Sequence, residues 1–336
     1  MGLWSRYRLR IERKRRRVRA LRKRRELTCL IDRTDQVRPG DILVFSTLRN
    51  EHPRLEWFLD YYRNLGANHF FFVDNDSTDG SREYLASQPD TSVWHTSASY
   101  KRSKFGVDWL NGLKMKYANG HWVLVVDVDE LLVYPFCDTR DLRALTDWLD
   151  AAKVKSFGTM LLDMYPKGKI QHARVRAGKD PVKTAPFFDS TNYFIERNSR
   201  YGNLWIQGGP RLRAFFRTKP SHAPALNKTP LVKWQRGYCY VSSTHTLLPR
   251  GLNLVYDEWG GQKPCGILLH TKFVNTFAEK AEEEIARKQH YAASREYRTY
   301  LKGLEGELNL WTPHSQEYAG WRQLEDLGLM SRGNWA

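Results

Sequence analysis

The sequence predicts an α/β fold, with helices covering both faces of a mostly parallel, mixed central sheet. Between residues 41 and 150, short apolar runs alternate with segments whose apolar residues recur every three or four positions, as in strands followed by helices. Three of the apolar runs also lead directly into clusters of polar and acidic residues. This arrangement is typical of sheets that bind ligands at the carboxyl ends of parallel strands.

Size and composition narrow the possible classes. The 336 residues are 41% hydrophobic and 13% aromatic, enough for one large domain or two small ones. No run approaches the roughly 18 apolar residues of a membrane-spanning helix, and the N-terminus lacks the apolar segment of a secretory signal. The four cysteines are far apart and lack metal-binding spacing, so we expect a reduced, cytoplasmic setting.

Residues 1–38 are expected to form a basic N-terminal arm, with a linker at residues 31–40. Residues 1–25 hold 13 of the 54 Lys and Arg residues but one of the 37 acidic residues. The segment can form a helix with apolar anchors at Trp4, Tyr7, Leu9, Ile11, Val18 and Leu21. Such a helix suits an anionic membrane surface, so we expect peripheral contact at the inner face of the cell membrane. A solvated tail is the next alternative, and nucleic acid is the least favoured partner.

The first half of the body reads as alternating strands and helices. Residues 41–48, 69–73 and 92–96 are short apolar runs and predict three strands. A helical pattern begins at Pro53 and ends at Gly66, and another helix is expected over residues 104–118. Residues 139–152 and 157–164 predict one more helix and one more strand.

The most informative stretch is the apolar run at residues 122–126, which leads into Asp127, Asp129 and Glu130. If the strand continues, Asp127 and Asp129 point to the same side, because side chains alternate along a strand. Two such carboxylates repel each other, and a divalent cation relieves the repulsion. Their oxygen ligands suit Mg²⁺ or Mn²⁺. The alternative is a solvated strand end, but three acids in four positions favour the metal.

Two common nucleotide-binding motifs are missing from the sequence. There is no G-x-G-x-x-G after the first predicted strand and no G-x-x-x-x-G-K-[ST] anywhere. These absences argue against a dinucleotide-dependent dehydrogenase and a P-loop NTPase. The remaining candidate is a site that holds a nucleotide through acidic and amide side chains, with a metal ion on the phosphates.

Three motifs in order, F-S-T-L-R-N-E (45–51), V-D-N-D-S-T-D-G (73–80) and V-D-V-D-E (126–130), carry a resemblance. The chain resembles the family 2 glycosyltransferases, in particular a subgroup related to family 92, over about residues 41–280. The resemblance implies a GT-A fold over residues 39–275, a nucleotide-sugar donor, with a UDP type favoured, and inversion at the anomeric carbon. It also implies Mn²⁺ or Mg²⁺ on the donor diphosphate.

The resemblance also implies roles for individual residues. Near the base, ribose and phosphates of the donor it places Thr47, Asn50, Glu51, Asp74, Asn75, Asp76, Ser77 and Asp127. Lys104 is a further candidate for a phosphate contact, with a solvated lysine at a helix start as the alternative. As metal ligands it implies Asp127, Asp129 and His270, with His270 matching better than His245. Near the transferred sugar it places Glu130, Gly208, Gly209 and Arg211. For residues 75–81, a plain turn remains the alternative, since Asn, Asp, Ser and Gly are turn residues anyway.

Several expectations concern the second half of the chain. A strand is expected after the Gly208-Gly209 pair, with Arg211 and Arg213 on one face. Lys228 or Lys272 could neutralise the leaving diphosphate. For the carboxylate that takes the acceptor proton, the first choices are Asp257 and Glu258, with Asp189 and Glu196 as rivals. Residues 276–336 are expected to form a helical C-terminal extension packed on the body.

Taken together, these features predict a metal-dependent, inverting glycosyltransferase acting on a glycan or glycolipid acceptor, in cell-surface polysaccharide or lipopolysaccharide synthesis. One alternative is a nucleotidyltransferase, which would need a glycine-rich loop with Arg and Lys after the first strand; the sequence has none. The other is a non-catalytic adaptor that binds a membrane or nucleic acid through the basic arm.

Overall fold

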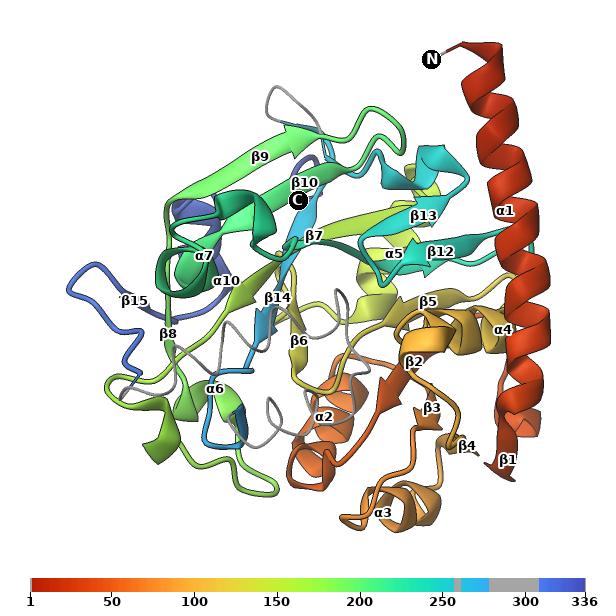
Figure 1. Cartoon of the computed structure of the whole chain (residues 1–336), viewed down its shortest axis with the longest axis horizontal. Helices are drawn as coiled ribbons and strands as arrows, with labels where there is room; N and C mark the ends of the chain where they lie inside the picture. Colours follow the sequence, from red (N-terminus) through yellow and green to blue (C-terminus); the bar gives the residue numbers. More distant parts are fainter. Residues whose placement is uncertain (1, 257–260, 278–307, 336) are drawn as a thin grey trace.

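The computed structural model describes residues 2–256, 261–277 and 308–335, and a nine-stranded mixed sheet forms its centre (Figure 1). The strands are β1 (Thr28–Ile31), β2 (Ile42–Leu48), β3 (His69–Asp74), β4 (Thr91–His95), β5 (Trp122–Val125), β6 (Glu130–Val133), β7 (Ser156–Asp163), β11 (Asn227–Lys233) and β14 (Cys265–His270). Their order across the sheet is β1-β4-β3-β2-β5-β11-β7-β14-β6. The predicted α/β class is therefore confirmed.

The strand directions explain where a ligand crevice forms. Strands β4, β3, β2 and β5 pair in parallel, as do β7 and β14, whereas β1, β11 and β6 run antiparallel to their neighbours. The chain moves outward from β2 through β3 to β4 and then returns to the other side of β2 as β5. Such a reversal leaves a crevice beyond the carboxyl ends of the two strands where it occurs, here β2 and β5.

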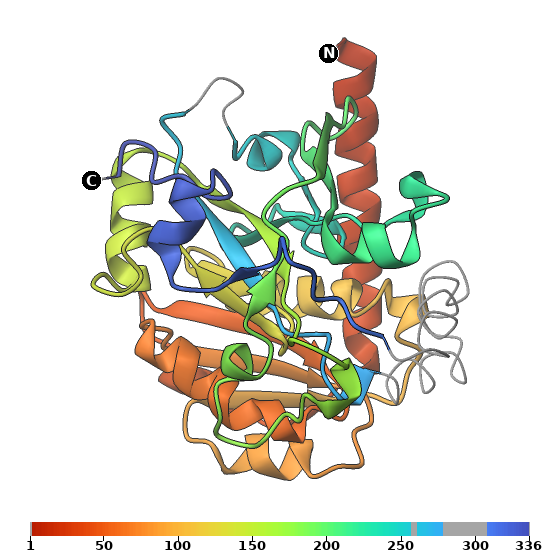
Figure 2. The same cartoon turned by 90° about the vertical axis from the view of Figure 1, so that its left-hand side faces the viewer.

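Helices cover both faces of the sheet, as expected. One face packs against α2 (His52–Asn64), α3 (Ser81–Ser87), α5 (Leu142–Ala151) and α10 (Trp321–Asp326). The other packs against α4 (Val107–Tyr117) and the hairpin of β12 (Cys239–Ser242) and β13 (Thr246–Leu248). Figure 2 shows α5 and α10 on one side of the molecule and α1 (Leu3–Lys23) on the other. Along β2, Ile42 and Val44 enter the first core and Leu43 and Phe45 the second, as strand alternation requires.

The N-terminal segment is not a separate arm on a linker. Its predicted helix is present as α1, but the helix packs along α4 and β12, and Leu9 and Ala20 are buried. The segment that follows forms β1, which pairs with β4 at the edge of the central sheet. The apolar residues Cys29, Leu30 and Ile31 can form a short strand, and the exposed edge of β4 supplies its hydrogen-bonding partner.

The Gly-Gly-Pro segment also differs from the prediction. It begins the helix α7 (Gly209–Phe215) and not a strand, because proline suits the first turn of a helix. Before it, β9 (Tyr193–Arg197) and β10 (Leu204–Gly208) form a hairpin. The remaining short elements are α6 (Pro181–Thr184), β8 (Phe187–Phe188) and β15 (Gln316–Glu317).

The C-terminal segment packs on the body where the structure describes it. Trp321, Leu324 and Trp335 are buried in the core under α5 and β6, while most of the helix predicted from residue 276 lies outside the described residues. Among the described helices, none combines the length and apolar character needed to cross a bilayer.

Candidate functional site

The acidic stretch after β5 forms a turn and not the end of a strand. Strand β5 ends at Val125, and the amide of Glu130 donates to the carbonyl of Asp127 at 3.0 Å. Asp127 and Asp129 therefore do not share one face of a strand as predicted: the Asp127 side chain is 56% exposed and lies near Lys228, while that of Asp129 is 20% exposed and lies near His270. The turn carries the chain from β5 to β6, which pairs with β14 at the far edge of the sheet.

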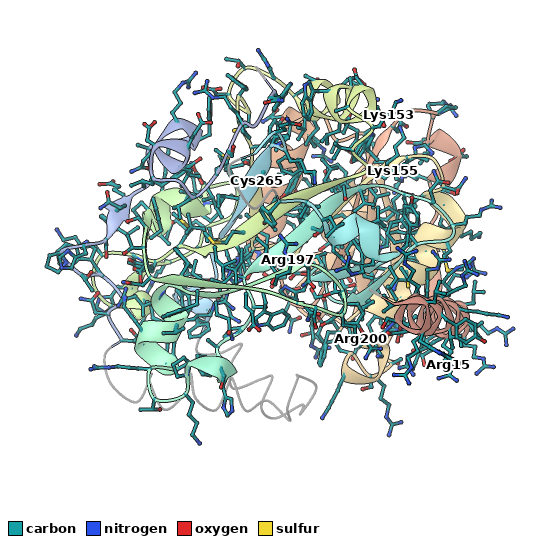
Figure 3. The ribbon with its side chains drawn as sticks, turned by 90° about the horizontal axis from the view of Figure 1, so that it is seen from above. Arg15, Lys153, Lys155, Arg197, Arg200 and Cys265 are labelled. Atoms are coloured by element: carbon teal, nitrogen blue, oxygen red, sulfur yellow. The ribbon has the colours of Figure 1, made fainter. Side chains whose placement is uncertain are left out.

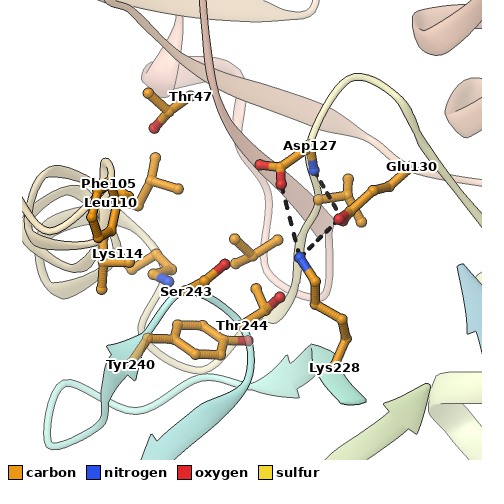
Figure 4. Close-up of a pocket in the computed structure, with 13 residues that line it drawn as sticks. Thr47, Phe105, Leu110, Lys114, Asp127, Glu130, Lys228, Tyr240, Ser243 and Thr244 are labelled. Carbon is orange, nitrogen blue, oxygen red and sulfur yellow. Dashed lines mark hydrogen bonds and ion pairs between the residues drawn. The ribbon is translucent and has the colours of Figure 1, made fainter. Parts of the chain in front are cut away.

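Lys228 on β11 balances the charge of two of these acids (Figure 4). Its ammonium donates to Glu130 at 2.8 Å and lies 3.8 Å from Asp127. Burial would lower the pKa of Lys228, but the two carboxylates outweigh it and raise the pKa above its usual value. Desolvation and the like charge of Glu130 raise the pKa of Asp127, although its half-exposed side chain keeps contact with water.

A second cluster of charged side chains connects the turn at residues 127–130 to β14 and β7. His270 Nε2 lies 3.3 Å from Asp129 Oδ2, while its Nδ1 lies 2.7 Å from Asp163 Oδ1. The guanidinium of Arg211 on α7 donates to the other oxygen of Asp163 at 2.6 Å. Burial would raise the pKa of Asp163, but Arg211 and His270 lower it. Burial would lower the pKa of His270, but the carboxylates on its two sides raise it.

Asp129 and His270 form an ion pair at 3.3 Å, and these are the two residues that would hold a divalent cation at this position. Ligands at neighbouring octahedral positions, about 2.1 Å from the ion, are roughly 3.0 Å apart, close to the 3.3 Å seen here. The contact of Nδ1 with Asp163 leaves Nε2 facing Asp129, which is the arrangement of carboxylate–histidine–metal sites. Within the described part of the chain, no group of three or more His, Cys, Asp or Glu is placed to hold a metal. Asp127, which faces Lys228, is therefore not joined to this pair, and water or substrate phosphate would complete the shell.

The loops after β2 and β3 come together as predicted, but Asp74 faces inward. The Asp74 carboxylate is buried and accepts from the amide of Ser77, from Arg82 and from His95 at 3.2–3.3 Å. Asn75 donates to the carbonyls of Thr96 and Ala98. These side chains thus hold the loop itself together.

Residues of the loop after β2 form hydrogen bonds with the loop after β3 and the start of α3. Asn50 has a positive φ of 51°, and its side chain accepts from the amide of Thr78 at 2.9 Å. The amide of Asn50 donates to Ser77, and that of Glu51 donates to Ser81. Asp76 is 53% exposed, and its carboxylate lies 3.6 Å from the guanidinium of Arg49.

The remaining predicted donor and acceptor residues have local structural roles. Lys104 lies toward α1, where burial and Arg16 lower its pKa. A Cβ at Gly208 would lie 2.4 Å from the carbonyl of Asn192, so this glycine permits the close approach of its own hairpin. Gly209 (φ 62°) lies against the Tyr193 ring in the same way.

The acids predicted to accept a proton lie in two different parts of the chain. Asp257 and Glu258 lie outside the described residues. The rival Asp189 forms an ion pair with Arg213 at 2.8 Å and accepts from the hydroxyl of Tyr165. Glu196 lies on β9, opposite Trp205 of β10.

The sequence interpretation missed Asp163, described above, and also Lys114. A pocket between α4, β2, β5 and the β12–β13 hairpin is lined by Thr47, Asp127, Lys228, Ser243 and Thr244, with Lys114 among the other lining residues (Figure 4). The Lys114 ammonium is buried, 4.4 Å from the ring centre of Trp234 and 4.1 Å from that of Tyr240. Burial lowers its pKa well below the usual value.

Comparisons with known proteins do not assign the chain to a family. No protein-family model matches it, and no curated protein matches it. Among solved structures it is similar to a crystal structure, in complex with sucrose, of a protein described as a glucose-1-phosphate thymidylyltransferase from Bacillus anthracis. The identity is 10%, the match covers 84% of this chain and 88% of that chain, and the TM-score is 0.29. A likeness at this TM-score carries no conclusion about the chemistry of this chain.

Proposed function

We propose that the protein is a metal-dependent, inverting glycosyltransferase that moves a sugar from a nucleotide-sugar donor, of the UDP type, to a hydroxyl of a glycan or glycolipid. The observation that carries this proposal is the Asp129–His270–Asp163 group beside the ligand crevice of the sheet. In this group the Asp129 carboxylate lies 3.3 Å from the His270 imidazole. The Asp163 carboxylate holds the other ring nitrogen of His270. The ordered motifs of the sequence supply the donor class.

In this proposal the donor lies across the carboxyl ends of β2 and β5. The nucleoside lies toward Thr47 and the loop of Asp76, and the diphosphate lies toward Asp129 and His270. A divalent cation held by these two residues would neutralise charge on the departing diphosphate. Asp127 and Lys228 lie 3.8 Å apart and both line the pocket, so an acid and a cation are available there together.

The transfer itself needs one bond made and one broken. The acceptor oxygen attacks the anomeric carbon, the bond from that carbon to the diphosphate oxygen breaks, and the acceptor proton passes to a carboxylate. Asp257 and Glu258 remain the predicted acceptors of that proton. Lys228 stays protonated, because Glu130 and Asp127 raise its pKa, so it can offset negative charge that develops on the leaving group.

A thermal-shift screen tests the proposal. Nucleoside diphosphates and sugar nucleotides are added to the full chain with Mn²⁺ or with EDTA, and stabilisation follows mass action for a ligand that binds the folded state. We expect a selective shift with one nucleoside diphosphate and its sugars that needs Mn²⁺, followed by release of free sugar or sugar transfer. Shifts by nucleoside triphosphates alone would instead favour nucleotidyl transfer.

A further inference from the structure

Five apolar side chains of α1 face away from the body of the protein. Leu9 and Ala20 are buried, whereas Leu3, Trp4, Tyr7, Val18 and Leu21 are 83%, 77%, 55%, 41% and 42% exposed. At 100° per residue, the five exposed residues form one stripe about 100° wide, opposite Leu9 and Ala20. A helix that only packed on its own domain would bury this stripe.

Polar contacts fix the inner side of α1 in place. Arg19 pairs with Asp108 of α4 at 2.6 Å, and Arg16 donates to the carbonyl of Val241 on β12 at 3.0 Å. The sole acid of the helix, Glu12, pairs with Arg200 at 2.7 Å. Helices α1 and α4 also approach closely, since a Cβ on Gly112 would lie 2.9 Å from the carbonyl of Ala20. Helix α1 therefore packs as a part of the body.

The outer side of α1 is strongly basic. Its exposed charged residues are all cationic: Arg6, Arg8, Arg10, Lys14, Arg15 and Arg22. Figure 3 shows Arg15 on the side of α1 away from the sheet, and Figure 1 shows the N-terminal end of the helix projecting beyond the body. At 100° per residue, Lys14 and Arg22 fall within the apolar stripe, and Arg10 and Arg15 lie just outside its two edges. A helix face that mixes apolar and basic side chains in this way, with Trp and Tyr near one end, has the chemistry of a helix lying in a lipid interface.

We propose that the outer face of α1 docks the protein on an anionic lipid surface. Nucleic acid would need the basic residues but not the apolar stripe, because binding without sequence preference depends on phosphate contacts. Since α1 is fixed to α4 and β12, which wall the pocket of Lys114, docking would also set the orientation of that pocket toward the bilayer. The inference does not depend on the reaction that the pocket supports.

Vesicle flotation of the full chain tests this proposal. Deleting α1 would remove Arg19, the ion-pair partner of the buried Asp108. Substitutions on the outer face of α1 leave this pair intact and are therefore preferred to a deletion. The test variant carries Trp4→Gln, Tyr7→Gln, Val18→Gln and Leu21→Gln. The matched control carries Phe194→Gln and Ile195→Gln on β9, which are 61% and 63% exposed. Vesicles of phosphatidylcholine alone are compared with vesicles that also contain phosphatidylglycerol.

We expect wild type and the β9 control to float with the anionic vesicles and the α1 variant to lose roughly tenfold or more of its vesicle binding. Its thermal unfolding midpoint should stay unchanged, because the substituted side chains are exposed. Equal flotation of wild type and the α1 variant would overturn the proposal. So would a wild-type protein that binds mixed-sequence nucleic acid but floats with neither vesicle.

Discussion

Two buried lysines of this protein sit beside the same pocket in opposite surroundings. Lys228 lies 2.8 Å from Glu130 and 3.8 Å from Asp127, and these carboxylates raise its pKa. Lys114 has two aromatic faces as neighbours, and within the described residues no carboxylate lies within 4.0 Å of its ammonium. Burial lowers its pKa.

The difference shows two ways in which a protein can hold a buried amine. Lys228 is one half of a charge balance, so its removal leaves an acid uncompensated. The Lys114 ammonium packs against two aromatic rings, and its lowered pKa favours the neutral amine. Because it neutralises no carboxylate among the described residues, its removal leaves no buried charge there without a partner. We therefore expect that the fold does not need the charge of Lys114, and that this amine in the wall of a pocket serves to contact a ligand.

The largest effect is expected for Lys228→Met. The substitution leaves Glu130 buried without its cation, and breaking a buried pair in this way costs about 3–5 kcal/mol of unfolding free energy. Urea unfolding of the variant and wild type measures the loss. The double variant Lys228→Met/Glu130→Leu should recover most of it, since both charges are then removed. Equal losses in the single and double variants would show that packing, and not the ion pair, is what Lys228 supplies.

Lys114→Met should be close to neutral or stabilising at pH 7. The side chain keeps its length and loses a polar group with no carboxylate partner, so we expect a gain of about 0–1.5 kcal/mol, mostly from avoided desolvation. The same urea experiment measures it. A loss above about 2 kcal/mol would mean that the cation–π contacts outweigh desolvation, and the contrast with Lys228 would fail.

The contribution of Lys114 should also depend on pH. Its folded pKa lies below the usual 10.5, so between these two values the unfolded chain holds a proton that the folded chain has released. Stability of the wild type therefore rises with pH through this window and levels off near 10.5. The advantage of Lys114→Met over wild type should shrink between pH 7 and pH 10, as measured by unfolding at both. A constant advantage would mean that the folded pKa is not lowered.

The smallest effect is expected for Lys233→Met, the exposed control. Lys233 pairs with Asp150 at 2.9 Å, but the two side chains are 30% and 45% exposed. Such surface pairs contribute about 0–1 kcal/mol, and urea unfolding should show a change no larger than that. A loss matching that of Lys228→Met would indicate that pairing alone, without burial, explains the first result.

The sequence predicted five of the nine strands of the sheet, β2, β3, β4, β5 and β7, because buried strands are continuous apolar runs. The run at residues 122–126 became β5, and the run at residues 69–73 became β3. The sequence did not predict β1, β6, β11 or β14 as strands. The acids after β5 were placed wrongly because strand alternation was extended beyond the last paired residue. A hydrogen bond from Glu130 to Asp127 closes a turn there instead.

Contacts between distant segments could not be predicted from local patterns. Asp163 meets Arg211 and His270 only because β7 pairs with β14 and α7 packs on β7. Nothing near Lys114 in the sequence marks it as a pocket residue, since its aromatic neighbours Trp234 and Tyr240 lie more than one hundred residues later. For α1, the sequence indicated an apolar stripe but not which side of the helix the body would cover.

The most direct test of the account is calorimetric titration of a UDP-sugar, with Mn²⁺ or EDTA, into wild type and Asp129→Asn. If Asp129 and His270 hold the cation that binds the donor diphosphate, wild-type affinity should require Mn²⁺. Asp129→Asn should weaken binding by roughly 10–100-fold or more, whereas the Lys233→Met control should bind as wild type does. Equal donor affinity in wild type and Asp129→Asn, with or without Mn²⁺, would contradict the proposed site.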